Sequence, residues 1–204
     1  MITGEIVNMY GKVSNVFFWQ WEMDFLQAIP HVDWLTVVMK IFTYMGEAGA
    51  FWIALSIVLA IIPKTRKCGF TMMIAMAVTF ILGNLVLKNL LARCRPGWYD
   101  QTFFESIKNG IKYPKDYSIP SGHTMNGITA SLCIFFYEKR FGILAIVIAC
   151  IIAFSRMYFF VHWPTDIITG ALLGAIDAVI SFFIIKKIYE AVEKKKAQKA
   201  LDAQ

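Results

Sequence analysis

Residues 154–166 read Phe-Ser-Arg-Met-Tyr-Phe-Phe-Val-His-Trp-Pro-Thr-Asp, which places Arg156, His162 and Asp166 between two strongly apolar segments. An ionisable side chain next to hydrocarbon costs at least about 2.5 kcal/mol, so such residues at the ends of membrane spans indicate a functional site. His162 and Asp166 are four residues apart. This spacing lets the carboxylate accept a hydrogen bond from one ring nitrogen while the other nitrogen stays free to attack.

The composition is that of an integral membrane protein. Of the 204 residues, 58% are hydrophobic and 17% are charged, whereas soluble domains are about 45–50% apolar. The formal net charge of +6 comes largely from Lys and Arg that flank the apolar segments, as is typical of membrane helices. This placement argues against nucleic-acid binding. We predict one integral membrane domain over residues 1–204, with the bilayer as its partner.

Five apolar segments follow one another along the chain, each near the ~20 residues that a membrane helix needs or completed by amphipathic flanks. They cover residues 48–62, 69–91, 122–137, 141–161 and 165–185. We therefore predict an all-α fold. It is a polytopic bundle of five or six transmembrane helices, with the site within residues 48–186 and a basic cytoplasmic tail at 187–204.

Residues 1–47 mix aromatic with charged residues and allow two interpretations. Between positions 31 and 44, apolar side chains recur at helical spacing, namely Leu35, Val38, Met39 and Phe42. This pattern indicates an amphipathic helix. The helix either lies at the membrane interface or forms a steeply tilted sixth span, and the sequence does not choose between them.

The basic residues orient the bundle. If the five segments alternate in direction, the turn at 64–67, the turn at 139–140 and the tail from Lys186 fall on one side, and positive residues concentrate on the cytoplasmic side. The polar residues from Lys88 to Asp166 that flank the other segment ends then face outward. We predict a multi-pass plasma-membrane protein with a cytoplasmic C-terminus and an extracytoplasmic site.

The last apolar segment carries a stripe of small residues. Gly170, Gly174 and Ala178 stand four apart, a pattern that lets helices approach closely. We expect packing within the bundle, with dimerisation as the alternative, and the oligomeric state stays open.

Three polar clusters are expected to meet on the outer side: Lys88 with Arg95-Pro96, then Pro120-Ser121-Gly122-His123, then Arg156 with His162 and Asp166. Lys88 offers a point charge, while Arg95 and Arg156 offer planar forks of donors that match phosphate oxygens. Ser121 and Gly122 open a helix, where backbone N–H groups and the helix dipole attract an anion. The clusters together predict a phosphate site.

The two histidines suggest the reaction. With a phosphate ester held among the cations, neutral His162 would attack phosphorus in line, oriented by Asp166, and form a phosphohistidine. His123 would protonate the leaving oxygen and later help water attack. The cations would stabilise the charge on the equatorial oxygens.

Each residue also has a simpler explanation. A single Lys88, Arg95 or Arg156 is more often a side chain that snorkels to the interface, and Asp166 alone is more often a helix cap. A zinc site would need a compact ligand pattern such as His-Glu-x-x-His, which is missing. We therefore predict no metal and no cofactor, and the joint occurrence on one face favours the phosphate site.

In order and spacing these residues resemble the three-part signature of the type-2 phosphatidic acid phosphatase superfamily. The signature here is Lys88, six residues, Arg95-Pro96; then Pro120-Ser121-Gly122-His123; then Ser155-Arg156, five residues, His162, three residues, Asp166. The superfamily comprises metal-independent membrane lipid phosphatases, with soluble acid phosphatases and vanadium haloperoxidases as relatives. The departure lies in residues 1–47, because the membrane branch is usually described with six spans and five are evident here.

The resemblance implies a role for each residue: His162 as nucleophile, Asp166 as its partner, His123 as general acid, and Lys88, Arg95, Ser121, Gly122 and Arg156 as phosphate binders. It also implies a hydrolase that acts on a lipid phosphate. Undecaprenyl diphosphate, the carrier recycled in cell-wall synthesis, is the favoured substrate, and phosphatidylglycerol phosphate and phosphatidate are alternatives. A non-catalytic lipid-phosphate binding or transport protein is a further alternative, but the catalytic residues whose loss would signal it are all present.

Overall fold

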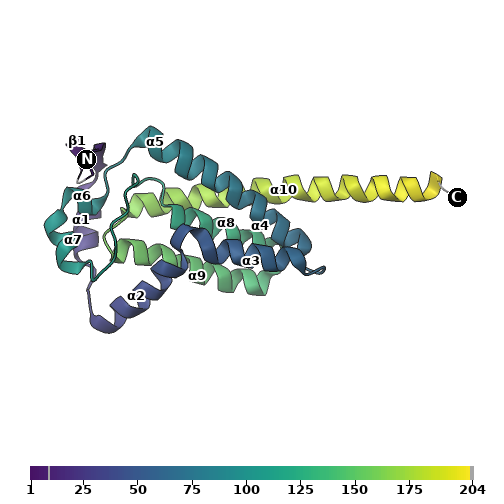
Figure 1. The fold of residues 1–204 in the computed structure, drawn as a ribbon, viewed down its shortest axis with the longest axis horizontal. Coiled ribbons are helices and arrows are strands. Elements are labelled where there is room, and N and C mark those ends of the chain that lie inside the picture. The colour runs from purple at the N-terminus through teal and green to yellow at the C-terminus, as the bar shows by residue number, and fades with distance from the viewer. Residues whose placement is uncertain (9, 203–204) are drawn as a thin grey trace.

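The computed structural model describes residues 1–8 and 10–202, and helices make up most of it. A bundle of long helices forms the body, and a hairpin with several short helices covers one end of it (Figure 1). The mainly helical architecture confirms the predicted fold class. Each of the five apolar segments coincides with a helix.

The bundle is built around one central helix. Its members are α3 (Ala50–Ile61), α4 (Arg66–Thr79), η2 (Phe80–Leu87), α5 (Lys88–Leu91), α8 (Gly122–Tyr137), α9 (Lys139–Tyr158) and α10 (Pro164–Asp202). The central helix α8 packs against α4, α9 and α10. The chain passes through α4, η2 and α5 as one helix over residues 66–91, and this helix carries Lys88 to one end of the bundle.

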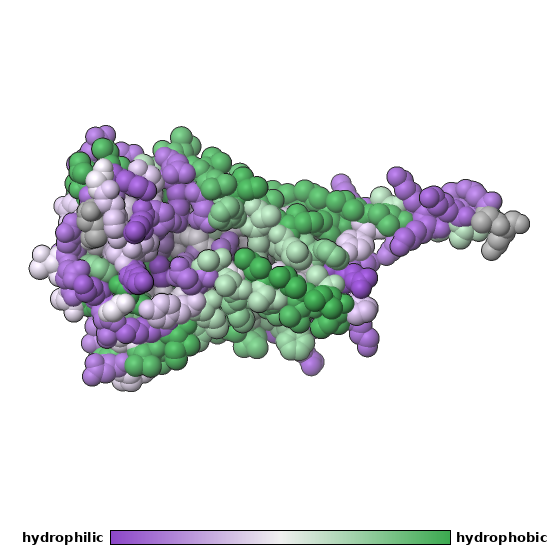
Figure 2. All heavy atoms as spheres, viewed as in Figure 1, coloured by the Kyte–Doolittle hydropathy of each residue, from purple (hydrophilic) through white to green (hydrophobic). Residues whose placement is uncertain are grey.

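The lipid-facing surface is visible in side-chain exposure. Within the described part of the chain, three helices are long and apolar enough to cross a membrane, namely Arg66–Leu91, Lys139–Tyr158 and Pro164–Asp202. On the face that Figure 2 shows, apolar residues cover the middle of the molecule as a band, with polar residues at both ends. Helix α8 has 16 residues and is mostly enclosed by its neighbours.

A bent pair of helices precedes the bundle, where the sequence left an interfacial helix and an extra span as alternatives. Helix α2 (Asp33–Met45) runs into η1 (Glu47–Gly49) and α3, with a bend of 45° between the two parts. The bend falls at residues in the left-handed region, Ala48 at φ 50° and Gly49 at φ 69°. By length and composition the pair fits either one broken span or a re-entrant loop.

The first residues form a β-hairpin, which the all-helical prediction did not include. Strands β1 (Ile2–Val7) and β2 (Val13–Phe18) pair antiparallel, with Ile2 opposite Phe18. Valine and phenylalanine favour strands, and Val16 and Phe18 are buried against the rest of the protein. The hairpin also extends along the chain between Lys88 and Arg95, because Asn15 bonds through its backbone to Ala92 and Cys94 at 2.8 and 2.7 Å.

Short helices and the loop after α9 complete the covered end. They are α1 (Gln20–Gln27), α6 (Pro96–Tyr99) and α7 (Gln101–Ile107). One hydrophobic cluster joins Tyr158, Phe159, Phe160 and Trp163 to side chains from all three helices, among them Met23, Trp98 and Phe104. This cluster fixes the loop between α9 and α10, which carries His162.

The small-residue stripe of α10 packs inside the bundle, as predicted. A Cβ atom on Gly174 would lie 2.6 Å from the Met125 carbonyl oxygen, and one on Gly170 would lie 2.8 Å from that of Ser121. Both contacts are to α8 or its first turn, so the glycines set the spacing between α8 and α10. Beyond the bundle, α10 continues as an exposed helix to Asp202 (Figure 1).

Candidate active site

A cavity of about 750 Å³ lies at the end of the bundle where α8 and α10 begin and α9 ends. Most of the residues predicted to act on phosphate line it: Lys88, Arg95, Gly122, His123, Arg156 and His162. The other two, Ser121 and Asp166, are fully buried next to the lining residues. Segments far apart in the sequence therefore meet at one place.

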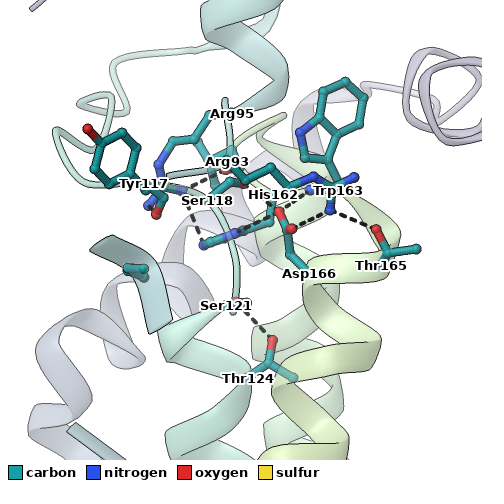
Figure 3. A network of polar contacts seen from close by, with 12 residues as sticks. Arg93, Arg95, Tyr117, Ser118, Ser121, Thr124, His162, Trp163, Thr165 and Asp166 are labelled. Atoms are coloured by element: carbon teal, nitrogen blue, oxygen red, sulfur yellow. Dashed lines mark hydrogen bonds and ion pairs between the residues drawn. The ribbon is translucent and has the colours of Figure 1, made fainter. Parts of the chain in front are cut away.

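His162 is held at both ring nitrogens. Nδ1 lies 3.3 Å from Oδ2 of Asp166, and Nε2 lies 3.2 Å from Nη1 of Arg95 (Figure 3). A carboxylate accepts and a guanidinium donates, so Nδ1 carries the proton and the Nε2 lone pair accepts from Arg95. This tautomer is the one that a nucleophilic histidine needs.

Asp166 receives four donors and is completely buried. Oδ2 accepts from the backbone N–H of Trp163 at 2.8 Å and from the hydroxyl of Ser118, as well as from His162, and Oδ1 accepts from Nη1 of Arg93 at 2.5 Å. The bond to Trp163 is the cap that the simpler explanation expected. The same carboxylate also orients His162, so the two explanations hold together.

Asp116 sits among the cations of the cavity. Its carboxylate pairs with Nζ of Lys88 and, at 2.7 Å, with Nη2 of Arg95. Burial by itself would raise the pKa of Asp116, but Arg95 and Lys88 outweigh burial and hold that pKa well below its usual value. The carboxylate is thus an anion already bound where two predicted phosphate ligands converge, and a phosphate must share these cations with it.

The cavity keeps His162 uncharged. Burial lowers the pKa of its imidazole well below the usual value, and the positive charges of Arg95, Lys88 and Arg156 lower it further. A neutral imidazole retains the lone pair that attack on phosphorus requires. The cations that would bind phosphate therefore also keep the histidine in its reactive form.

Arg156 and His123 present donors that no described residue uses. Nη1 of Arg156 donates to the hydroxyl of Thr43, while its buried Nε has no partner among the described residues. His123 Nε2 is likewise buried without a hydrogen bond there and lies 3.8 Å from a carboxylate oxygen of Glu47. Buried polar atoms are normally paired, so these two groups are suited to a bound ligand.

Ser121 and Gly122 differ in what they offer. The amide of Ser121 donates to the Asp166 carbonyl at 3.2 Å, and its hydroxyl accepts from Thr124 at 3.0 Å. Gly122 instead lines the cavity, and the first N–H groups of a helix have no intrahelical acceptor. Of the two residues, Gly122 is therefore the one that lines the cavity, while Ser121 fixes the start of α8 to α10.

Several residues of the site escaped the sequence analysis. They are Glu22, Thr43, Glu47, Arg93, Asp116 and Ser118. Arg93 stands two positions before Arg95, and Glu22 is an acid within an aromatic stretch. These two sequence positions could have marked Arg93 and Glu22 as candidate site residues. The contacts of Thr43 and Ser118 depend on tertiary folding alone.

An apolar pocket of about 360 Å³ adjoins the cavity. Ala48, Phe80 and Asn126 line both spaces. The remaining lining of the pocket comes from α3 and α4, including Ile53 and Met73 on the apolar band. A molecule with a polar head and an apolar tail fits this combination.

Comparisons with known proteins agree with this geometry. The PAP2 superfamily matches residues 64–190. The chain is 34% identical to a protein named undecaprenyl-diphosphatase from Sulfolobus acidocaldarius, and the match covers 95% of this chain and 93% of the relative.

Two solved membrane proteins have a similar fold. A transmembrane PAP2 type phosphatidylglycerolphosphate phosphatase from Bacillus subtilis is 26% identical, with a TM-score of 0.63 over 84% of each chain. LpxE from Aquifex aeolicus is also 26% identical, with a TM-score of 0.65 over 78% of this chain and 91% of that one. With its signature residues around one cavity, this chain belongs to the PAP2 superfamily and is a membrane lipid phosphatase.

Proposed function

We propose that the chain removes the terminal phosphate of undecaprenyl diphosphate through a phosphohistidine on His162. The observation that carries the proposal is the convergence of Lys88, Arg95, Arg156 and His162 on one cavity, with the imidazole held between Arg95 and Asp166. Three cations beside a neutral, oriented nucleophile match the demands of phosphoryl transfer.

Each step uses a group that lines the cavity or backs it. Nε2 of His162 forms a bond to the terminal phosphorus, and the bond from phosphorus to the bridging oxygen breaks. His123, in its protonated form, gives a proton to that oxygen, so undecaprenyl phosphate leaves. Water then attacks the phosphohistidine while the now neutral His123 accepts the water proton, and the bond from phosphorus to Nε2 breaks to release inorganic phosphate.

The substrate assignment rests on the relative and on the pocket. The 34% identical relative is named undecaprenyl-diphosphatase, and the pocket between α3 and α4 gives a long apolar tail a path from the cavity to the lipid. Phosphatidylglycerol phosphate is the second candidate, because the Bacillus subtilis protein of similar fold, with a TM-score of 0.63, is named a phosphatidylglycerolphosphate phosphatase.

We place the cavity on the extracytoplasmic side. The basic turn at 64–67 lies at the opposite end of the bundle, where Lys67 pairs with Glu193 of α10 at 3.1 Å. Lys139 and Arg140, which begin α9 directly after the end of α8, are at that end too. Since positive residues mark the cytoplasmic side, the polar end that holds the cavity faces outward.

Trapping the intermediate tests the mechanism. Purified protein is mixed with undecaprenyl diphosphate labelled in its terminal phosphate and quenched within milliseconds, and we expect the label on His162. His162→Ala should lose release of phosphate by at least about 10³-fold, as removal of a nucleophile does. His31→Ala is the matched control, because His31 lies outside the cavity and bonds to the Tyr158 carbonyl. Label on any other residue would refute the assignment.

A substrate panel tests the specificity. Phosphate release from undecaprenyl diphosphate, phosphatidylglycerol phosphate and phosphatidate is measured in one detergent, with excess chelator present. We expect the largest specificity constant for undecaprenyl diphosphate and activity that survives the chelator. A larger constant for phosphatidylglycerol phosphate would select the second candidate instead.

A further inference from the structure

A chain of buried ionic groups lies behind His162. Nη1 of Arg93 donates to Oδ1 of Asp166 at 2.5 Å, and Nη2 donates to Oε2 of Glu22 at 3.1 Å. All three side chains are at most 1% exposed. Buried charges of this kind are costly unless each is paired and hydrogen-bonded. Every charged group in the series Glu22, Arg93, Asp166 has such a partner, and the series ends at His162.

Arg93 is fixed on every side. Its Nε donates to the Phe17 carbonyl at 2.9 Å, and Nη1 also donates to the Thr165 hydroxyl at 2.7 Å. The guanidinium carbon lies 4.9 Å from the ring centre of Phe17 and 5.5 Å from that of Trp163. A side chain bound in this way has one orientation, and Asp166 is fixed with it (Figure 3).

Glu22 is held just as firmly, although it comes from the N-terminal segment. Oε1 accepts from the backbone N–H and the hydroxyl of Thr165 at 3.2 and 2.6 Å, and Oε2 accepts from the Trp19 amide at 3.0 Å. Thr165 is the residue before Asp166. Helix α1 is thus attached to the first turn of α10, at the position that determines where Asp166 points.

Glu22 also changes the charge that His162 experiences. Arg93 paired with Asp166 alone would be neutral, and a neutral pair supports little positive charge on the imidazole. With Glu22 the three groups carry one net negative charge. Positive charge develops on the ring as it bonds to phosphorus, and a fixed negative charge behind it stabilises that state.

We propose that Glu22 and Arg93 are positioning residues for the nucleophile, which act on His162 through Asp166. The N-terminal segment, which precedes the family match at 64–190, thereby completes the catalytic apparatus. The inference rests on the proposed role of His162. The proposal adds Glu22 of α1 and Arg93 to the residues that take part in the reaction, which otherwise line the cavity or contact its lining.

The test compares Glu22→Gln with Asp24→Asn in the full-length protein. Both changes remove one negative charge from α1, but Asp24 is exposed and bonds only to Gln20 in the described contacts. Glutamine keeps the size of Glu22 and an acceptor for Thr165. We expect kcat to fall about tenfold in Glu22→Gln, the scale seen when a group that orients a catalytic ligand is altered, with KM unchanged. Removing one partner of a buried ion pair also lowers the melting temperature, so kcat is measured at a temperature where the variant is fully folded. Asp24→Asn should match the wild type.

A second background separates positioning from a general loss of structure. In Arg93→Gln, Asp166 and Glu22 face each other without the cation between them, so kcat should fall further. Adding Glu22→Gln there removes the unpaired carboxylate, and kcat should then stay level or rise. Effects of residues that act as a unit are not additive.

The outcomes are decisive for Glu22 and Arg93. A wild-type kcat in Glu22→Gln, the same loss in both backgrounds, or a lower melting temperature that accounts for the lost activity would each overturn the proposal. Failure of the proposed function would show differently, as wild-type protein that releases no phosphate or as His162→Ala that keeps its activity.

Discussion

At the residue scale, a small number of groups set the protonation state and the orientation of His162. Asp166 fixes one ring nitrogen and Arg95 the other. The surrounding cations favour the neutral ring, and the carboxylate on its other side would favour the positive charge that develops in the proposed attack on phosphorus. The free enzyme and the enzyme in that proposed reaction therefore need opposite electrostatic effects, which Arg95 and Asp166 exert from opposite sides of one imidazole.

The pH response of His162 follows from its surroundings. Its pKa is lowered well below the usual value by burial and by Arg95, Lys88 and Arg156, so the ring should stay neutral as pH falls through about 6.5, the ordinary value. It should take up a proton only at lower pH, where attack is lost. The chain has 3 histidines, so ¹⁵N-histidine NMR in micelles, with His162→Asn to assign the signal, can follow this ring alone. A midpoint at or above 6.5 would contradict the electrostatic description of the cavity.

At the element scale, the position of the site is set by how α8 and α10 approach each other. His123 opens one helix and Asp166 the other, and Ser121 bonds across to the Asp166 carbonyl. Gly170 and Gly174 allow this approach, because a side chain at either position would meet the backbone of α8 or of the residue before it. The periodicity of small residues was enough to predict close packing, and the partner helix was not predictable from it.

A side chain added at the contact between α8 and α10 should lower the free energy of unfolding. In Gly174→Ala the new methyl group would lie 2.6 Å from the Met125 carbonyl oxygen, and backbone cannot move aside as a side chain can. We expect a loss of about 1–3 kcal/mol, the range for overpacked cores, seen as a lower melting temperature in detergent.

The control for this change is Gly4→Ala in the hairpin. A Cβ atom there meets nothing within 4 Å, so its melting temperature should stay near that of the wild type. Equal melting temperatures for Gly174→Ala and the wild type would mean that α8 and α10 are packed less tightly than described.

At the scale of the whole molecule, the apolar band separates two polar ends with different chemistry. One end holds the cavity and its cover of hairpin, α1, α6 and α7, and the other holds the basic turns and the extended part of α10 (Figure 2). A lipid with its phosphate at the first end and its tail in the band can reach the cavity through the pocket between α3 and α4.

Labelling from outside the cell tests the proposed orientation. Single cysteines replace Lys115, near the cavity, or Lys196, on the distal part of α10, in a Cys150→Ser background, because Cys150 is the exposed cysteine while Cys68, Cys94 and Cys133 are buried. A membrane-impermeant maleimide should label Lys115→Cys in intact cells and Lys196→Cys only after permeabilisation. The reverse pattern would place the cavity in the cytoplasm.

Hydropathy, spacing and residue chemistry are local properties of the chain, so they were enough to predict the helical membrane fold, the five apolar segments and the eight signature residues. The contacts that surround those residues depend on the tertiary fold. The hairpin beside residues 92–94, the pairing of Asp116 with Lys88 and Arg95, and the link from Glu22 through Arg93 to Asp166 join positions tens of residues apart. Contacts of that kind arise from how the buried surfaces fit together, and no periodicity in the sequence encodes them.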